Sequence, residues 1–294
     1  MKQRSVLKKL IVILIFGITF DRVRLLIMKH FKWYGSFLFM RTFLLSLLMI
    51  ISITACDQSK KPLPQEVESP ANTTSTTAQK SHPDYITYNA DLQKQRVRFF
   101  WKDPRGEHYE RIDAVNKELA QQQTNLLYAV NGGIFQEDLT PLGLFIQDQK
   151  VQAPLNKRRG YGNFYVQPNG VFYITKQQKA GIVSTASFKQ VSSITDAIQS
   201  GPMLLIDGLI NPLFTKGSSN VNIRNGVGIK PDNTVVFSMS KRPVNFYDFA
   251  NYFKTQGCVN ALYLDGAISQ SYCPEQDWKQ TGGRFSVIIG VIEK

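Results

Sequence analysis

Four polar residues that follow apolar runs and stand beside glycines are the best candidates for chemistry in this sequence. Asn131 lies in AVNGGIF, Ser200 in QSGPMLL, Arg224 in IRNGVGI and Asp265 in YLDGAIS. Glycine at such a position lets backbone N–H groups approach a ligand closely. An arginine and a carboxylate among such turns would suit binding of an anionic substrate and stabilisation of charge during a reaction.

Each segment alone is a weak signal, because an Asn-Gly or Asp-Gly pair is most often a hairpin turn. Two of the segments differ from an ordinary hairpin. Asn131 and Asp265 come directly after buried-type runs, Leu126–Val130 and Ala261–Leu264, and no matching short return strand follows. These two positions are therefore better read as the ends of core strands.

The motifs that the sequence lacks narrow the chemistry. It contains no HExxH, no CxxC pair, no Walker loop and no GxGxxG after a strand, so zinc and nucleotide chemistry are disfavoured. After Cys56 only His82 and His108 remain. A Ser-His-Asp triad would need His108, which stands in a polar loop with Asp103, Arg105 and Glu107.

Taken together and in this order, the glycine-flanked segments resemble the phosphodiester glycosidase domain family, including its bacterial branch. The family pattern runs from Asn-Gly-Gly-aromatic through Ser-Gly-Pro and Arg-x-x-x-Gly to Leu-Asp-Gly-Gly-x-Ser. This chain supplies Asn131-Gly132-Gly133 with Phe135, Ser200-Gly201-Pro202, Arg224 with Gly228, and Leu264-Asp265-Gly266 with Ser269. The resemblance covers about residues 125–292. Ala267 stands where the family commonly has a second glycine, which bears on the substrate more than on the fold.

The resemblance implies a hydrolase that cleaves the glycosidic bond between a sugar and a phosphodiester. Such a reaction passes through an oxocarbenium-like transition state that a carboxylate stabilises, and the phosphomonoester leaves readily. The implied roles are a carboxylate for Asp265, a phosphate ligand for Arg224, and a sugar contact or an orienting bond to Asp265 for Asn131. The substrate- or phosphate-binding positions are Gly132, Gly133, Ser200, Gly266 and Ser269, and Ser269 has support of Asp265 as its alternative.

Several assignments stay open. A second catalytic carboxylate is not identifiable, since Glu137, Asp138 and Asp207 are each more typical of solvated turns. A divalent cation such as Ca²⁺, bound through Asp265 and carbonyl oxygens, is conceivable but has no loop signature. The run Lys157-Arg158-Arg159 is typical of a solvated loop, and its alternative role is to attract an anionic substrate at the rim of the site.

Two other classes of function compete with the hydrolase. The first is a non-catalytic lipoprotein on the same fold that binds a glycan or envelope polymer, in which Tyr161, Phe164 and Tyr263 would govern affinity. The second is a nucleic-acid binder, suggested by the net charge of +13 over 294 residues. Residues 1–55 carry +8 of that charge, and the remaining +5 on residues 56–294 speaks against nucleic acid as a partner.

The amino-terminal part predicts export and lipidation. Residues 1–55 hold two apolar runs beside basic residues, and the second run leads into Ile-Thr-Ala-Cys at 53–56, which resembles a bacterial lipobox with Cys56 as the lipidated residue. The true start would then be Met28 or Met40. Asp57 resembles an inner-membrane retention signal, so the expected location is the periplasmic face of a bacterial envelope, anchored in the membrane.

The rest of the chain predicts a tether and one folded domain. Residues 57–83 are rich in Pro, Ser, Thr and Gln, which is typical of a disordered segment. Residues 84–294 alternate short β-rich runs with few helical patterns, the clearest helix being 245–255. Hairpins are expected at 168–170, 207–208 and 230–233. The fold class expected is α+β, a single domain on largely antiparallel sheet.

Two cysteines bracket the YLDGAIS segment. In an oxidising compartment Cys258 and Cys273 would be able to form a disulfide that fixes the Asp265 turn, the alternative being two separate thiols.

Overall fold

The computed structural model describes residues 82–266 and 268–294 of the chain. The expected signal segment, Cys56 and almost all of the expected tether lie outside these described residues. All of the described residues belong to one compact unit. None of their helices is long and apolar enough to cross a membrane.

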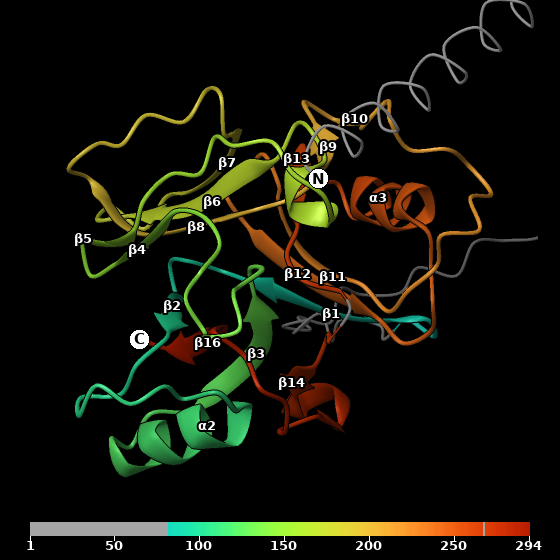
Figure 1. Cartoon of the computed structure of the whole chain (residues 1–294). Coiled ribbons are helices and arrows are strands. Elements are labelled where there is room, and N and C mark those ends of the chain that lie inside the picture. The colour runs from blue at the N-terminus through green and yellow to red at the C-terminus, as the bar shows by residue number, and fades with distance from the viewer. Residues whose placement is uncertain (1–81, 267) are drawn as a thin grey trace, which may run out of the picture. The chain divides into compact units, whose positions relative to one another are not determined.

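The strands form three antiparallel sheets, which Figure 1 shows as separate layers of arrows. The first has the order β1-β12-β11-β13-β9-β10 and comprises Tyr85–Ala90, Val235–Ser240, Asn225–Ile229, Asn260–Tyr263, Met203–Ile206 and Leu209–Ile210. The second has the order β15-β14-β3-β16-β2 and comprises Trp278–Lys279, Ser271–Cys273, Leu126–Gly132, Val287–Glu293 and Gln95–Phe100. The third has the order β5-β4-β8-β6-β7 and comprises Lys150–Ala153, Phe145–Gln147, Ile194–Ser200, Gly170–Thr175 and Ala180–Ser184.

The three sheets share one hydrophobic core. Tyr128 of β3 stacks on Phe237 of β12, with ring centroids 5.4 Å apart, and Phe172 of β6 meets the same Phe237 edge-on at 6.1 Å. All three rings are fully buried. Because each ring belongs to a different sheet, burial of this cluster holds the three sheets together.

Two α-helices of the described residues pack on the sheets, α2 on the second sheet and α3 on the first. α2 (Ile112–Gln121) packs against β3 through Ile112, Val115 and Leu119, which recur on one helical face. α3 (Phe246–Thr255) packs against β9 and β10 (Figure 1). Short 3-10 helices span Asn163–Tyr165 and Pro274–Gln276. The expected α+β class, mostly antiparallel, is confirmed.

The helix expected at residues 245–255 is confirmed. Asn245 is its N-cap, and its side-chain oxygen accepts a hydrogen bond of 2.9 Å from the backbone N–H of Asp248. Phe249 and Phe253 bury the apolar face, and Gly257 follows with a φ of +81° that ends the helix.

Two of the three expected hairpins are present and one is wrong. β9 and β10 pair around residues 207–208, and β11 and β12 pair around 230–233. At 168–170, by contrast, no hairpin turn forms. Phe164 lies instead in a 3-10 helix, where its ring is buried, and Asn169 donates from its side-chain amide to the Phe164 carbonyl. Gly170 begins β6, whose hairpin partner is β7.

The expected disulfide is also wrong for this structure, since Cys258 and Cys273 are both free and buried. Cys258 follows α3 and packs with Phe253 on the outer side of the first sheet. Cys273 closes β14 in the second sheet and lies in the shared core. The two thiols sit in different apolar clusters because β13 and β14 join different sheets. Burial raises the pKa of each thiol to about 12.

Thiol alkylation of the full-length chain tests this arrangement. In the folded protein neither Cys258 nor Cys273 should react, because both are buried and protonated at neutral pH. In denaturant without reductant, mass spectrometry of the digested protein should find both residues alkylated. Recovery of a Cys258–Cys273 cross-linked peptide would contradict the arrangement.

Candidate active site

The site lies where strands from all three sheets end. β3 closes with Asn131 and Gly132, β8 closes with Ser200, and β11 opens with Asn225. β13 runs antiparallel to β11, with Tyr263 opposite Gly226, so the end of β13 and the start of β11 share one edge. Asp265 lies two residues after the end of β13 at Tyr263. The structure therefore brings together the strand-end residues that the sequence singled out.

One buried side chain links two of these sheets. The amide nitrogen of Asn225 donates to the backbone carbonyl and to the side-chain oxygen of Asn131, at 2.9 Å each. Its amide oxygen accepts a hydrogen bond of 2.8 Å from the backbone N–H of Asp265. Asn225 is fully buried. Its amide thus fixes the position of Asp265 relative to the end of β3.

The backbone of the Asp265 segment is held at further points. The Asp265 carbonyl accepts from the side-chain amide of Asn131 at 3.2 Å and from the hydroxyl of Ser269 at 2.9 Å. The buried hydroxyl of Ser200 donates to the Leu264 carbonyl at 2.6 Å. Asp265 itself is only half-buried. Its segment is therefore held by hydrogen bonds to its backbone while Asp265 stays partly open to solvent.

These bonds favour one of the alternatives that the sequence left open for each residue. Asn131 is buried, and its side-chain oxygen also accepts from the Gln270 backbone N–H at 2.9 Å. It therefore orients the Asp265 segment. Ser269 supports the same segment through its hydroxyl. Ser200 was expected to contact substrate, but its hydroxyl is buried and bonded to backbone, which gives it a positioning role in this structure.

The glycines of the site are explained by close packing. A Cβ on Gly132 would lie 2.5 Å from Ile289, and one on Gly133, whose φ is +77°, would lie 2.5 Å from Ile198. A Cβ on Gly266 would meet the Tyr263 hydroxyl and the Ile223 carbonyl oxygen. The Gly266 N–H donates to the Tyr263 hydroxyl at 2.5 Å, so it is already used within the protein.

Arg224 is fully buried, and its guanidinium is largely occupied. Nε donates to the Val244 carbonyl at 2.8 Å, and Nη2 donates to the Asn220 carbonyl at 2.9 Å. The guanidinium carbon lies 3.6 Å from the centroid of the Phe246 ring. Burial lowers the pKa of Arg224, and the nearby Tyr263 opposes that shift. Only Nη1 is buried without a hydrogen-bond partner, so the phosphate ligand expected from the sequence cannot bind a phosphate through two guanidinium nitrogens.

Tyr263 connects Arg224 to the Asp265 turn. Its ring is buried, and its hydroxyl accepts from Gly266 and lies 3.4 Å from the side-chain amide of Asn163. Burial, and secondarily the charge of Asp265, raise the pKa of this hydroxyl, which therefore stays neutral. Because Tyr263 and Phe164 are both buried, the competing glycan-binding hypothesis retains only Tyr161 as an exposed aromatic contact.

Within the described residues, the structure identifies no second catalytic carboxylate. Asp207 lies in the β9–β10 turn, at the opposite end of β9 from Ser200. Asp138 is exposed and accepts from the Thr140 backbone N–H, and this bonding lowers its pKa. Glu137 is exposed on the same loop. Within residues 82–266 and 268–294, no three His, Cys, Asp or Glu side chains gather as a metal site would require.

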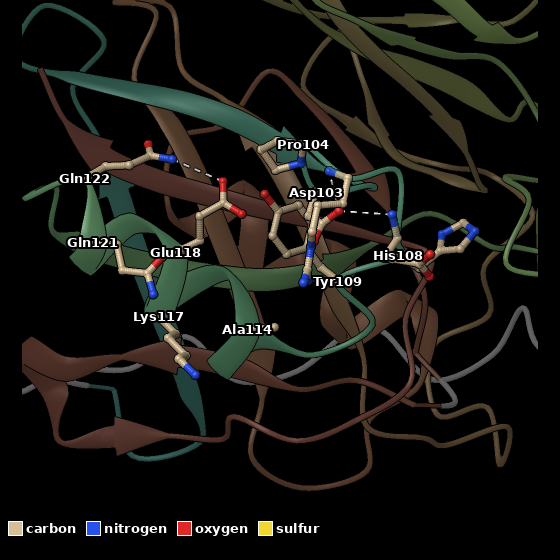
Figure 2. Close-up of a pocket in the computed structure, with 11 residues that line it drawn as sticks. Asp103, Pro104, His108, Tyr109, Ala114, Lys117, Glu118, Gln121 and Gln122 are labelled. Carbon is tan, nitrogen blue, oxygen red and sulfur yellow. Dashed lines mark hydrogen bonds and ion pairs between the residues drawn. The ribbon is translucent and has the colours of Figure 1, made fainter.

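A prominent cavity lies elsewhere in the described part of the chain. It measures about 660 Å³ and is formed by α2 and the loop after β2, as Figure 2 shows. Three of its charged groups are engaged with neighbours: Asp103 pairs with Arg105 at 2.7 Å, and Glu118 accepts from Gln122 at 3.1 Å. None of the strand-end residues lines it, so we do not assign the chemistry to this cavity.

Comparison with known proteins places the chain in a family. A sequence model of the phosphodiester glycosidase family matches residues 124–286, which include every strand-end residue described above and exclude the cavity at α2. The chain belongs to the phosphodiester glycosidase family. It is 41% identical over 186 residues to the uncharacterized protein YigE of Escherichia coli K12, covering 63% of this chain and 72% of that protein.

Two solved structures resemble this one more distantly. The catalytic domain of zebrafish N-acetylglucosamine-1-phosphodiester alpha-N-acetylglucosaminidase, auto-inhibited by its pro-peptide, is 19% identical with a TM-score of 0.48, over 74% of this chain and 86% of that one. A hypothetical protein from Synechocystis is 13% identical with a TM-score of 0.47, over 71% and 59% of the two chains.

Sequence reasoning missed Asn225 as part of the site, and it named Tyr263 only as an affinity residue of the glycan-binding alternative. Asn225 directly follows Arg224, but no local pattern distinguishes it from a turn residue. Its partner Asn131 is 94 residues away, so its role becomes visible only in three dimensions.

Replacement of Asn225 by alanine tests the network. It should lower the free energy of unfolding by about 2–4 kcal/mol, because the Asp265 N–H and the Asn131 oxygens would lose their buried partner. Urea unfolding measures this change. The matched control is Asn251→Ala on the exposed face of α3, which should change stability by less than about 0.5 kcal/mol. Equal effects of the two substitutions would contradict the role given to Asn225.

Proposed function

We propose that this chain hydrolyses sugar phosphodiesters at the glycosidic bond, with Asp265 as the reacting carboxylate. The observation that carries the proposal is the position of Asp265. It follows a core strand, its backbone is held by Asn225, Asn131 and Ser269, and it remains half-exposed. Membership of the phosphodiester glycosidase family supports the same reaction class.

The proposed reaction breaks the bond between the anomeric carbon and the phosphate oxygen. Water adds to the anomeric carbon, the electron pair of the broken bond stays on the phosphate oxygen, and the products are a free sugar and a phosphomonoester. Positive charge develops on the sugar ring in the transition state. The Asp265 carboxylate stabilises that charge. Because a phosphomonoester is a good leaving group, the step needs little help from a general acid.

The rigid support of Asp265 matters for this role. A carboxylate that is already in place when charge develops stabilises the transition state without reorganisation. Residues that act through Asp265, namely Asn225, Asn131, Ser200 and Ser269, are positioning residues in this proposal. Their loss would lower the rate because the carboxylate would be less well placed.

Arg224 is proposed to act on the phosphate through its positive charge, because its guanidinium is buried. Nη1 is the only guanidinium nitrogen without a hydrogen-bond partner, while Nε and Nη2 hold Val244 and Asn220. A buried cation next to the Asp265 turn favours a neighbouring phosphate through the low local dielectric. We assign no metal to the reaction, and a divalent cation remains a variable for the assay.

We further propose that the folded part is held at the periplasmic face of a bacterial envelope membrane by lipid on Cys56. The sequence Ile-Thr-Ala-Cys at 53–56 and the apolar run before it support this proposal. A diacylglyceryl group carries more than one acyl chain, which stable anchoring requires.

Asp265→Asn tests the proposed chemistry. The substitution keeps the shape of the side chain and removes its charge, so sugar release from N-acetylglucosamine-1-phosphate methyl diester should fall at least about 1,000-fold. The thermal midpoint should change little. The assay compares wild type and variant, with and without Ca²⁺, by chromatography of the released sugar.

The matched control is Asp277→Asn, which neutralises a carboxylate that is 95% exposed. It should retain full activity. A fully active Asp265→Asn enzyme would rule out the proposed mechanism. A wild-type protein that binds sugar phosphodiesters but releases no sugar from any of them would favour a binding protein over an enzyme.

A further inference from the structure

A second concave surface, here called the basic pocket, lies between two segments that continue along the chain to residues of the candidate active site. It measures about 320 Å³. One wall is the segment 136–142, including Gln136 and Thr140, and the other is the segment 152–158, including Gln152, Lys157 and Arg158. Its size is at the small end of the range for ligand pockets and would accommodate one sugar-phosphate unit.

The two walls of the basic pocket are tied together. The side-chain amide of buried Asn156 donates to the Leu142 carbonyl at 2.8 Å. Asn156 is in turn fixed by Gln199, which accepts from its backbone N–H at 2.9 Å and donates to its carbonyl at 2.7 Å. Gln199 is buried in β8 directly before Ser200. The pocket is therefore built on the same strand that supports the Asp265 segment.

Both walls also lead along the chain to the candidate active site. The segment 136–142 follows the end of β3 at Asn131 and Gly132. The other wall continues through Arg159 to Asn163, whose side-chain amide lies 3.4 Å from the Tyr263 hydroxyl, the acceptor of the Gly266 N–H. Asn163 is four positions after Arg159 in the chain, so the two Cα atoms are at most about 14 Å apart.

The charge on this loop is not neutralised by the protein. Lys157, Arg158 and Arg159 are all exposed, and none forms an ion pair within the part of the chain that the structure describes. Other exposed arginines of the domain, such as Arg111 and Arg242, do have carboxylate partners. Next to the three cations stands Tyr161, whose side chain is completely exposed.

The burial of Arg224 leaves phosphate binding largely to other cations, such as these three. With two of its nitrogens already bonded, Arg224 offers at most one contact to a phosphate. A substrate with several anionic groups needs further positive charge outside the catalytic centre. Lys157 and Arg158 at the mouth of the basic pocket are placed to provide it, and flexible exposed cations bind phosphate groups readily.

We propose that the basic pocket binds a neighbouring sugar-phosphate unit of an anionic glycan, so that the substrate is a polymer with several phosphate groups. This inference rests on the proposed function, because it extends the substrate beyond the bond that is cleaved. Polar Gln136, Thr140 and Gln152 would face the sugar hydroxyls, Lys157 and Arg158 the phosphate, and Tyr161 would stack on a sugar ring at the rim.

The test compares the full-length protein with a Lys157→Ala, Arg158→Ala double variant. The ligands are dextran phosphate, uncharged dextran and a duplex DNA of matched charge, and binding is measured by calorimetry at several salt concentrations. The double variant should bind dextran phosphate about tenfold more weakly and with a smaller salt dependence, because two phosphate contacts are lost. Uncharged dextran should bind far more weakly than dextran phosphate.

The matched control is a Lys176→Ala, Lys189→Ala double variant, which removes the same charge from exposed positions outside the basic pocket. It should change the affinity less than about twofold. An unaltered affinity of the pocket variant, or an equal loss in both variants, would overturn the proposal. Tighter binding of DNA than of dextran phosphate, lost in the pocket variant, would assign the pocket to nucleic acid instead.

Kinetics separate this inference from the proposed function. On a phosphate-linked glycan polymer the pocket variant should show a raised KM with an unchanged kcat, while turnover of the small methyl diester stays at the wild-type level. Asp265→Asn should bind dextran phosphate like wild type. If no sugar phosphodiester is hydrolysed but dextran phosphate binding still depends on Lys157 and Arg158, the proposed function fails and the binding site stands.

Discussion

The site depends on the buried amide of Asn225, which bonds to Asn131 on one sheet and to the Asp265 N–H at the end of another. Antiparallel pairing brings the start of β11 and the end of β13 to one edge, but pairing alone does not fix the backbone beyond the last residue of a strand. A fully buried amide with its hydrogen bonds satisfied does so, because misplacing it would leave buried polar groups without partners.

Most of the polar residues around Asp265 follow from that constraint. Ser200, Asn131 and Ser269 each donate to a carbonyl of the segment 264–265. Gly266 has no room for a side chain between Tyr263 and the Ile223 carbonyl. These residues therefore hold the turn at 264–266 in one conformation. Asp265 has its backbone held by these hydrogen bonds and is also partly exposed to solvent. Such support by neighbouring residues is what a preorganised catalytic group requires.

Local sequence patterns predicted the elements whose structure depends mainly on residues close together in the chain. The helix expected at 245–255 and the hairpins at 207–208 and 230–233 agree with the structure. The hairpin expected at 168–170 is absent. Phe164 is buried in a 3-10 helix, and a buried residue at this position in the sequence pattern looks the same as one in a strand. The disulfide failed because sequence separation does not reveal that Cys258, in the loop before β13, and Cys273, in β14, are buried in different apolar clusters.

The candidate site was partly predictable for the same reason. Asn131, Ser200, Arg224 and Asp265 stand out because each interrupts or ends an apolar strand beside glycine. Their individual roles depend on partners far away in the chain, such as the Asn225–Asn131 pair 94 residues apart and the packing of Arg224 on Phe246. Those contacts show that two of the three guanidinium nitrogens of Arg224 are already bonded within the protein. No local pattern indicates this.

The central claim is that the network acts on catalysis through Asp265. A double-mutant cycle on kcat tests it most directly, using Asn225→Ala, Asp265→Asn and the combined variant on one sugar phosphodiester. The account predicts that Asn225→Ala lowers kcat in the wild-type background and has almost no further effect once Asp265 is neutral. Equal losses of kcat in both backgrounds would contradict it, since the Asn225 amide would then act on the reaction independently of the carboxylate.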